Sequence, residues 1–146
     1  MVLKMGTYDT FSTTADVGIR IYGYGYTGLF QSAIKGLNLL YFSDWDDDWE
    51  AKAPAPVQRL PFEYYGDSCE NILVNLLSEA IYLLQNENKI TAGIDVKEVN
   101  ETHLKADLLT IPCTIQPEME LKSVTYHNLK VEDKNGFKYA EIIFDV

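Results

Sequence analysis

The sequence predicts an α+β protein with two layers, in which two helices pack on a mostly antiparallel sheet. Only two segments, residues 29–41 and 72–84, place apolar side chains at helical spacing. The remainder after the second helix has strand character, with short links between the strands. The expected order of elements is β-β-α-β-α-β-β-β-β, and a length of 146 residues suits a single domain over 1–146.

The first half of the chain supplies a strand pair, a helix and a loop. Apolar residues alternate with other residues over 17–22, which predicts a half-buried strand, and we expect another strand at 8–12 before it. The helix at 29–41 has Thr27 as its expected N-cap. The acidic and then Pro-rich and Ala-rich segment 43–56 predicts a loop, and a strand follows at 57–65.

The second helix has signals at both ends. Asp67 or Ser68 can cap its start, and Glu70 follows Asp67 at the spacing of a capping box. The segment 86–88 is expected to end it. Its broad apolar stripe consists of Ile72, Leu73, Leu76, Leu77, Ala80, Ile81 and Leu84.

Strands are expected at 89–99, 103–110, 119–131 and 137–145. Between the last two, Asn135-Gly136 predicts a type I′ hairpin turn, because both residue types tolerate positive φ angles.

The composition of the chain limits the kinds of partner and the cellular compartment that we expect. The formal net charge is −10, which argues against a direct grip on a nucleic-acid backbone and is compatible with binding a cation or a basic protein surface. The sequence has no signal peptide and no apolar run of the roughly 20 residues that a membrane helix needs. Cys69 and Cys113 form no motif and are expected to be free thiols, so we expect a cytoplasmic protein.

Residues 23–28, GYGYTG, match the G-x-G-x-x-G pattern of dinucleotide-binding folds, and Asp44 follows about 20 residues later. Arg20 lies inside the preceding strand, however, where a parallel sheet would be buried on both faces. The rest of the chain also lacks further crossover helices. The pattern is therefore interpreted as a flexible Gly/Tyr turn.

The run Asp44-Trp45-Asp46-Asp47-Asp48 begins like a calcium-binding EF-hand loop. That loop would need glycine at Trp49 and glutamate at Ala55, so we reject it and predict a solvated acidic loop. An acidic docking surface with the two flanking tryptophans as anchors is the alternative. No histidine–cysteine zinc spacing and no hydrolase motif is present, so no catalytic residue is predicted.

Two carboxylates stand at strand tips, Asp16 at the start of one strand and Asp145 at the end of another. If these strands lie side by side antiparallel, the carboxylates meet, with the main chain and α-carboxylate of Val146 close by. Such hard oxygens suit Ca²⁺, Mg²⁺ or Mn²⁺. Alternatively, Asp16 caps a turn and Asp145 is a solvated charge.

In the segment 122–127, KSVTYH, polar residues fall on both faces of the expected strand. An edge strand with solvated polar side chains explains this. The alternative is that Lys122 and His127 face a phosphate or a partner.

Several blocks of this chain resemble the archease family. TTADVGIRIYG at 13–23 is similar to the family's HTADIGIRAYG, and AEIIFDV at 140–146 to its AxVIFDI. LFQSAIKGL, ENILVNLLSEAIYL and LKSVTYHNLKV match further family blocks in the same order.

The resemblance implies an accessory protein, not itself an enzyme, that activates an RtcB-type RNA ligase in tRNA splicing and RNA repair. Archeases promote guanylylation and multiple turnover of that ligase, and they bind a divalent ion, assigned as calcium. The implied ligands are Asp16, Asp145 and the main chain of Val146, with Lys122 and His127 as candidates for the partner surface. Thr13 replaces the family histidine, which puts the details of metal binding in doubt.

Two other functions remain as alternatives. One is a stand-alone metal-dependent enzyme that acts on a small phosphorylated molecule. The other is a chaperone-like binding module.

Overall fold

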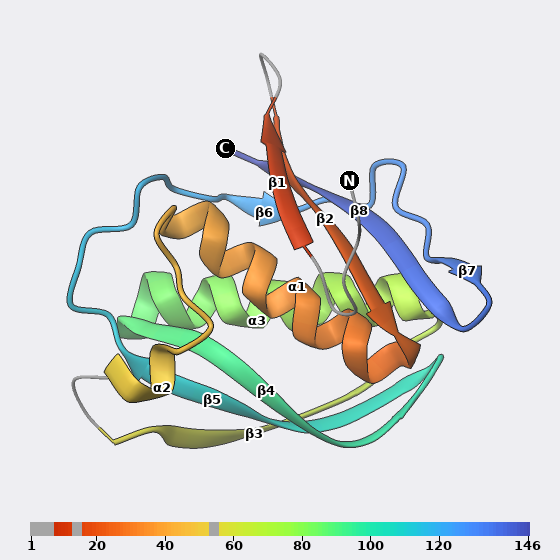
Figure 1. Cartoon of the computed structure of the whole chain (residues 1–146), viewed down its shortest axis with the longest axis horizontal. Helices are drawn as coiled ribbons and strands as arrows, with labels where there is room; N and C mark the ends of the chain where they lie inside the picture. The colour runs from red at the N-terminus through yellow and green to blue at the C-terminus, as the bar shows by residue number, and fades with distance from the viewer. Residues whose placement is uncertain (1–7, 13–15, 53–55) are drawn as a thin grey trace.

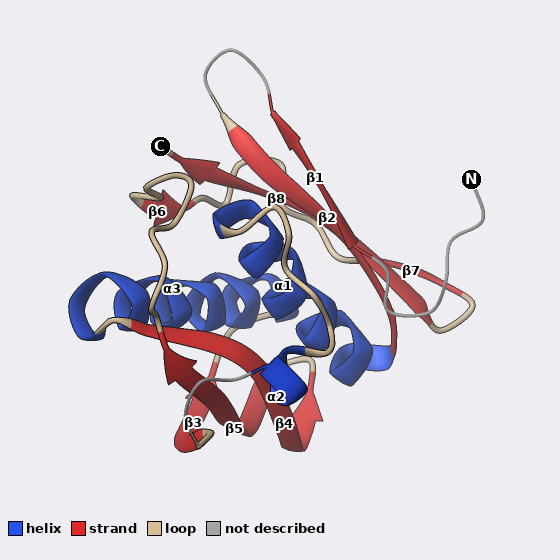
Figure 2. Cartoon of the chain, turned by 60° about the vertical axis from the view of Figure 1, so that its left-hand side comes forward, coloured by secondary structure: helices blue, strands red, loops and turns tan. Residues whose placement is uncertain are grey.

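The computed structural model describes residues 8–12, 16–52 and 56–146. Two antiparallel sheets lie on opposite sides of a pair of long helices (Figures 1 and 2). The larger sheet has the order β1-β2-β8-β6, with β7 also paired to β8, and the smaller has the order β3-β5-β4. The large-sheet strands are β1 (Tyr8–Ser12), β2 (Val17–Tyr24), β6 (Ser123–Val124), β7 (Glu132–Lys134) and β8 (Phe137–Asp145). The remaining elements are β3 (Gln58–Tyr65), β4 (Lys89–Asn100), β5 (His103–Pro112), α1 (Gly25–Tyr41), α2 (Trp49–Lys52) and α3 (Cys69–Glu87).

The predicted α+β class with mostly antiparallel strands is confirmed. The expected single sheet is instead two sheets, so the helices form a middle layer between them. The reason is visible in α1, whose buried residues extend around much of its circumference. Two of these residues are polar, and each donates a hydrogen bond to a strand of a different sheet. Ser32 donates a hydrogen bond to the Tyr22 carbonyl of β2 (2.6 Å), and Asn38 donates one to the Thr91 carbonyl of β4 (2.9 Å).

The joint between β2 and α1 explains the glycine pattern. β2 is antiparallel to both of its neighbours, so the parallel arrangement of a dinucleotide-binding fold is absent here. A Cβ atom on Gly23 would lie only 2.2 Å from the carbonyl carbon of Gly28. The backbone of residue 23 can therefore approach that of residue 28 this closely only because residue 23 is glycine. The N-cap expected at Thr27 is wrong: the N-cap is Tyr24, three residues earlier, and α1 begins at Gly25, which adopts φ +60°.

The predicted ends of α3 are confirmed, with one change. The Ser68 hydroxyl accepts a hydrogen bond from the Asn71 amide (3.1 Å), and Asn88 closes the helix in the left-handed conformation at φ 57°. The capping box does not form, because the Glu70 carboxylate accepts instead from the amide of Val131 (2.9 Å).

Two further expectations need correction. The segment 43–56, predicted as loop, contains the short helix α2. The strand predicted at 119–131 is mostly irregular, with only the two residues of β6 in the sheet. Asn128 accounts for the irregular second half of this segment, since it adopts φ 53° in a turn closed by a hydrogen bond from the Leu129 amide to the Tyr126 carbonyl. The Asn135-Gly136 turn is confirmed, with φ angles of 59° and 80°.

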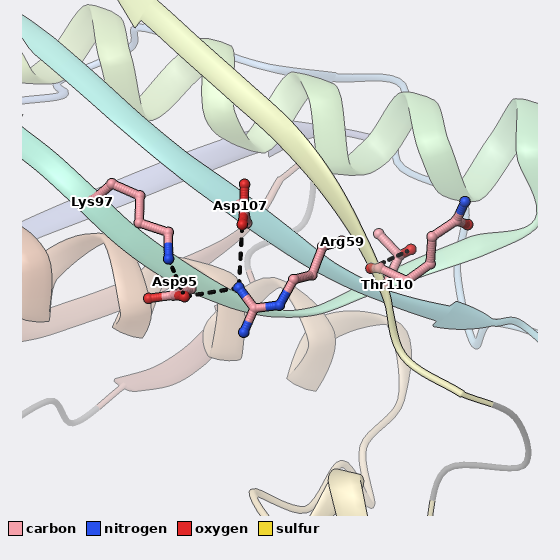
Figure 3. A network of polar contacts seen from close by, with 6 residues as sticks. Arg59, Asp95, Lys97, Asp107 and Thr110 are labelled. Atoms are coloured by element: carbon pink, nitrogen blue, oxygen red, sulfur yellow. Dashed lines mark hydrogen bonds and ion pairs between the residues drawn. The ribbon is translucent and has the colours of Figure 1, made fainter.

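An ion-pair network crosses the solvent-exposed side of the small sheet (Figure 3). Asp95 on β4 and Asp107 on β5 are directly opposite each other in the ladder. Arg59 on β3 lies between them, with its Nη1 atom 2.8 Å from Asp95 and 3.2 Å from Asp107. Lys97 reaches Asp95 as well, at 2.8 Å.

Candidate functional site

The start of β2 and the end of β8 are side by side, as expected from the positions of the two carboxylates. Val17 pairs with Phe144 as the last pair of the antiparallel β2–β8 ladder. Asp16 directly precedes Val17 and Asp145 directly follows Phe144, so both residues stand at the same end of this ladder. Asp16 is half-buried, whereas Asp145 is exposed.

The short strand β6 brings Lys122 to the same corner. Ser123 pairs with Asp145, and the Lys122 amide donates a hydrogen bond to the Asp145 carbonyl (2.8 Å). The Ser123 hydroxyl donates to the Asp145 carboxylate (3.1 Å), which holds that side chain beside β6. The pattern 122–127 did not mark Ser123 as part of the site, because its role depends on a strand pairing between distant segments. We refer to Asp16, Asp145, Val146, Lys122 and Ser123 as the acidic corner.

His127 lies further along the chain, past the end of β6. Its amide donates a hydrogen bond to the Thr125 hydroxyl (3.3 Å), and Thr125 in turn is bound to the Ile143 carbonyl of β8. Its ring is exposed and lies beside the Asn128 side chain. The chain has left the sheet at this point, so Lys122 and His127 do not share one strand face.

The acidic corner supplies oxygen donors of the type that hard cations prefer. Two carboxylates and the main-chain oxygens of Val146, a residue that is about half-exposed, belong to this corner. Within residues 8–12, 16–52 and 56–146, no three His, Cys, Asp or Glu side chains are grouped as metal ligands. A cation at this corner would therefore also depend on main-chain oxygens and water. The family histidine position, Thr13, lies outside the described residues.

Neither cysteine contributes to this corner. Both are free thiols, and burial is the main cause that raises the pKa of the Cys69 thiol to about 12. A thiol that stays protonated is a poor nucleophile, so Cys69 has a packing role.

Comparison with known proteins shows the family to which this chain belongs. The model of the Archease protein family (MTH1598/TM1083) matches residues 8–146. The chain belongs to the archease family. Protein archease of Thermoplasma volcanium is 27% identical, over 96% of this chain and 99% of its own. Protein archease of Pyrococcus furiosus is also 27% identical, over 97% of this chain and 100% of its own.

Two solved structures share the archease fold. The solution structure of Methanobacterium thermoautotrophicum protein 1598 aligns with a TM-score of 0.67 at 21% identity, over 97% of this chain and 100% of that one. The crystal structure of a Thermotoga maritima archease, described as a possible chaperone, aligns with a TM-score of 0.58 at 21% identity, over 93% and 94%. No helix in the described part of this archease is both long and apolar enough to cross a membrane.

Proposed function

We propose that this archease is an accessory protein that activates an RtcB-type RNA ligase, by promoting its guanylylation and multiple turnover. Membership of the archease family supports the proposal. The observation that carries it is the placement of Asp16 and Asp145 at adjoining strand ends, beside Lys122.

The acidic corner is built on rigid elements. β2 and β8 are neighbours inside the large sheet, and Ile19, Ile142 and Phe144 are fully buried. Asp145 is the last residue of β8 and is therefore held more accurately than a side chain on a loop, while Asp16 directly precedes β2. Asp16, Asp145 and the Val146 main chain would hold a divalent cation, most simply Ca²⁺, with Mg²⁺ or Mn²⁺ as alternatives. When bound, the ion would supply positive charge for nucleotide phosphates.

Lys122 and the overall charge would serve the encounter with the ligase. Lys122 is exposed and its backbone is bound to Asp145, so its ammonium would be available to pair with a phosphate or a carboxylate of the partner near the acidic corner. The net charge of −10 is complementary to a basic RNA-binding enzyme and would raise the association rate. The partner is thus a protein, and direct nucleic-acid binding is not part of the proposal.

Asp16→Asn and Asp145→Asn test the role of the carboxylates while keeping their size. We expect each to reduce stimulation of ligase guanylylation and turnover by about tenfold or more, because an amide is a weaker ligand than a carboxylate. Glu98→Gln is the matched control, since Glu98 is an exposed carboxylate on β4 of the opposite sheet. Full stimulation by folded Asp16→Asn and Asp145→Asn variants would exclude a role for the acidic corner.

Lys122→Met separates partner contact from ion binding. We expect this variant to bind Ca²⁺ with unchanged affinity in calorimetry and to stimulate the ligase less, with a smaller dependence on salt. His127→Ala, tested in parallel, should reduce stimulation if the exposed ring contacts the ligase. Wild-type stimulation by both variants would show that the ligase binds elsewhere.

A capture experiment distinguishes this proposal from a general chaperone role, such as the description of the Thermotoga maritima protein raises. Immobilised archease should retain one RNA ligase from a lysate. Retention of many unfolded proteins would favour a chaperone, and turnover of a phosphorylated small molecule without ligase would favour an enzyme.

A further inference from the structure

Aromatic side chains gather on the outward side of the large sheet. α1 packs against the inward side of β2, where Ile19 and Ile21 are fully buried, so the residues that alternate with them point away from the helices. Figure 2 shows both long helices on that inward side. The strand register places six mainly aromatic residues on the outward side of β1, β2 and β8, namely Phe11, Arg20, Tyr22, Tyr24, Phe137 and Tyr139. We refer to these six residues as the aromatic face.

Four rings of the aromatic face pair across the β2–β8 ladder. Tyr22 lies opposite Tyr139 with ring centroids 4.8 Å apart, and Tyr24 lies opposite Phe137 with ring centroids 4.9 Å apart. The centroids of Tyr22 and Phe137 are 6.3 Å apart, which joins the two pairs into one cluster. Tyr24 is 55% exposed and the other three residues are partly exposed, so the cluster is open to solvent.

Toward β1 the aromatic face continues through Phe11 and Arg20. A Cβ atom on Gly18 would lie 2.3 Å from the Phe11 ring, so this ring lies directly against the glycine backbone. The guanidinium carbon of Arg20 lies 4.6 Å from the centre of the same ring. Arg20 also pairs with Asp9 (3.4 Å) and Glu141 (3.5 Å) on the neighbouring strands. These contacts hold the ring and the cation in place on the sheet.

The open side of the small sheet has a different character. It carries the Arg59 network of charged side chains, although it faces the same solvent. A sheet with one solvated side ordinarily places polar residues there, as the small sheet does. Cross-strand aromatic pairs stabilise a sheet, but a contiguous exposed apolar patch with a polar rim is typical of an interaction site.

Charged residues around the aromatic face decide which partner it suits. The register places four carboxylates and two cations on the outward side of the described large-sheet strands, namely Asp9, Glu132, Glu141, Asp145, Arg20 and Lys134. This excess of negative charge repels a nucleic-acid backbone and a second copy of the same face, and it attracts a basic protein surface. Tyrosine and arginine are also the residue types that contribute most to binding between proteins.

The aromatic face and the acidic corner share one side of the large sheet. Asp145 follows Tyr139 by six positions on β8 and points outward with it, because side chains alternate along a strand. Six residues of extended strand span roughly 20 Å. A protein interface of ordinary size buries about 800 Å² on each partner and is roughly 30 Å across, so a single interface covers both regions.

We propose that the aromatic face is the docking surface for the RNA ligase and that it holds the acidic corner against that enzyme. This inference rests on the proposed ligase activation. The matching surface of the ligase has apolar side chains between lysines and arginines, which pack on the rings and pair with exposed carboxylates such as Glu132. The aromatic face then supplies affinity, whereas the acidic corner supplies the stimulation itself.

Titration of archease into a purified RtcB-type RNA ligase separates affinity from stimulation. Tyr24→Ala should weaken ligase binding about tenfold in calorimetry and raise the half-saturating archease concentration by the same factor. The plateau of stimulation should be retained, whereas Asp145→Asn should lower it. Within the described residues the Tyr24 side chain makes no capping hydrogen bond, so its removal leaves the start of α1 intact. Tyr65→Ala is the matched control with wild-type affinity, because exposed Tyr65 likewise ends a strand, β3, of the opposite sheet.

Two more variants test the rings and the charge separately. Tyr22→Thr/Tyr139→Thr removes one ring pair and keeps β-branched residues that suit a strand, so the chain should stay folded in circular dichroism and bind at least tenfold more weakly. Glu132→Lys should slow association with the ligase and reduce its salt dependence. Glu98→Lys makes the same charge change on β4 of the small sheet and should leave association close to wild type.

Each contrary outcome has its own meaning. Wild-type affinity in folded Tyr24→Ala and Tyr22→Thr/Tyr139→Thr would overturn the docking surface and leave the proposed ligase activation standing. An equal loss of affinity in Tyr65→Ala would overturn it too. No binding between wild-type archease and the ligase would refute the proposed activation, and this inference with it. Self-association or single-stranded RNA binding that is lost in Tyr24→Ala would assign the face to a second copy or to RNA and overturn the proposal.

Discussion

At the scale of single residues, the Arg59 guanidinium offsets the repulsion between two aspartates that are paired across neighbouring strands. Asp95 and Asp107 face each other across β4 and β5, and like charges in that position repel. Arg59 donates to both carboxylates. The hydrogen bond from Arg59, followed by that from Lys97, lowers the pKa of the Asp95 carboxyl below its ordinary value.

Arg59→Met should therefore destabilise the fold in a manner that depends on pH. Because the Asp95 pKa is lower in the folded than in the unfolded chain, its stabilising contribution is complete above the ordinary aspartate pKa of about 3.9 and is lost as the pH falls through the folded value. Urea unfolding should show the largest difference from wild type near neutral pH and almost none at strongly acidic pH. Lys97→Met, which leaves Arg59 in place, should have a smaller effect. A difference that grows in acid would contradict this account.

Residues whose partners are near in sequence were predictable, and residues with distant partners were not. Asn135-Gly136 could be predicted because the turn needs only its own φ angles. One distant contact is an exception: the start of β2 and the end of β8 could be expected to meet, because Asp16 and Asp145 mark recognisable strand tips. The contact of Glu70 with Val131, and that of Ser123 with Asp145, depend on which segments fold together.

At the scale of elements, α3 is a helix with a defined cap at each end. The Ser68 hydroxyl satisfies the Asn71 amide, which would otherwise lack an intrahelical acceptor. Asn88 reverses the chain by adopting the left-handed conformation, and its amide binds the Leu83 carbonyl. The chain then enters β4 directly.

Ser68→Ala should cost about 1 kcal/mol of the free energy of unfolding, because the amide at the start of α3 loses its acceptor. Ser78→Ala is the control. Ser78 is exposed in the interior of the same helix, where alanine is the better helix former. Chemical denaturation of both variants measures the difference. Equal stabilities for the two would mean that water replaces the cap at no cost.

In the segment 119–131, alternating polar and apolar residues do not form a continuous strand. Its polar and apolar residues resemble a strand, but only Ser123 and Val124 join the sheet. Thr125 still binds the Ile143 carbonyl of β8 through both its amide and its hydroxyl, after which Asn128 turns the chain away. Positive φ at a single asparagine interrupts a strand without changing the hydrophobic pattern.

At the scale of the whole molecule, α1 is shared by both sheets. It packs against β1, β2 and β8 on one side and against β4 on the other. The broad apolar surface of each helix could be recognised in the sequence, but the sequence does not show which strands cover each side. That choice among strands is why one sheet was expected where two are present.

Because α1 packs against both sheets, the amide hydrogens of the two sheets should lose their protection from exchange together when α1 is destabilised. Leu37→Ala, at a side chain only 2% exposed, should lower the free energy of unfolding by about 2–5 kcal/mol. Amide hydrogen exchange should accelerate equally in the protected cores of β4 and β8. Gln31→Ala, at an exposed position of the same helix, should leave both rates unchanged. Faster exchange in only one sheet would show that the two sheets open independently.

The place of β8 in the large sheet has a consequence for the timing of folding. β8 follows every other strand in the sequence, yet it lies between β2 and β6. A ribosome therefore delivers β1, β2 and α1 long before the strand that completes their sheet. Until then one edge of β2 has unpaired backbone groups, and Asp16 lacks Asp145 as its neighbour. The ends of β2 and β8 can meet only after β8 has been synthesised, so a partner that binds the acidic corner also distinguishes chains in which β8 has joined the sheet from chains in which it has not.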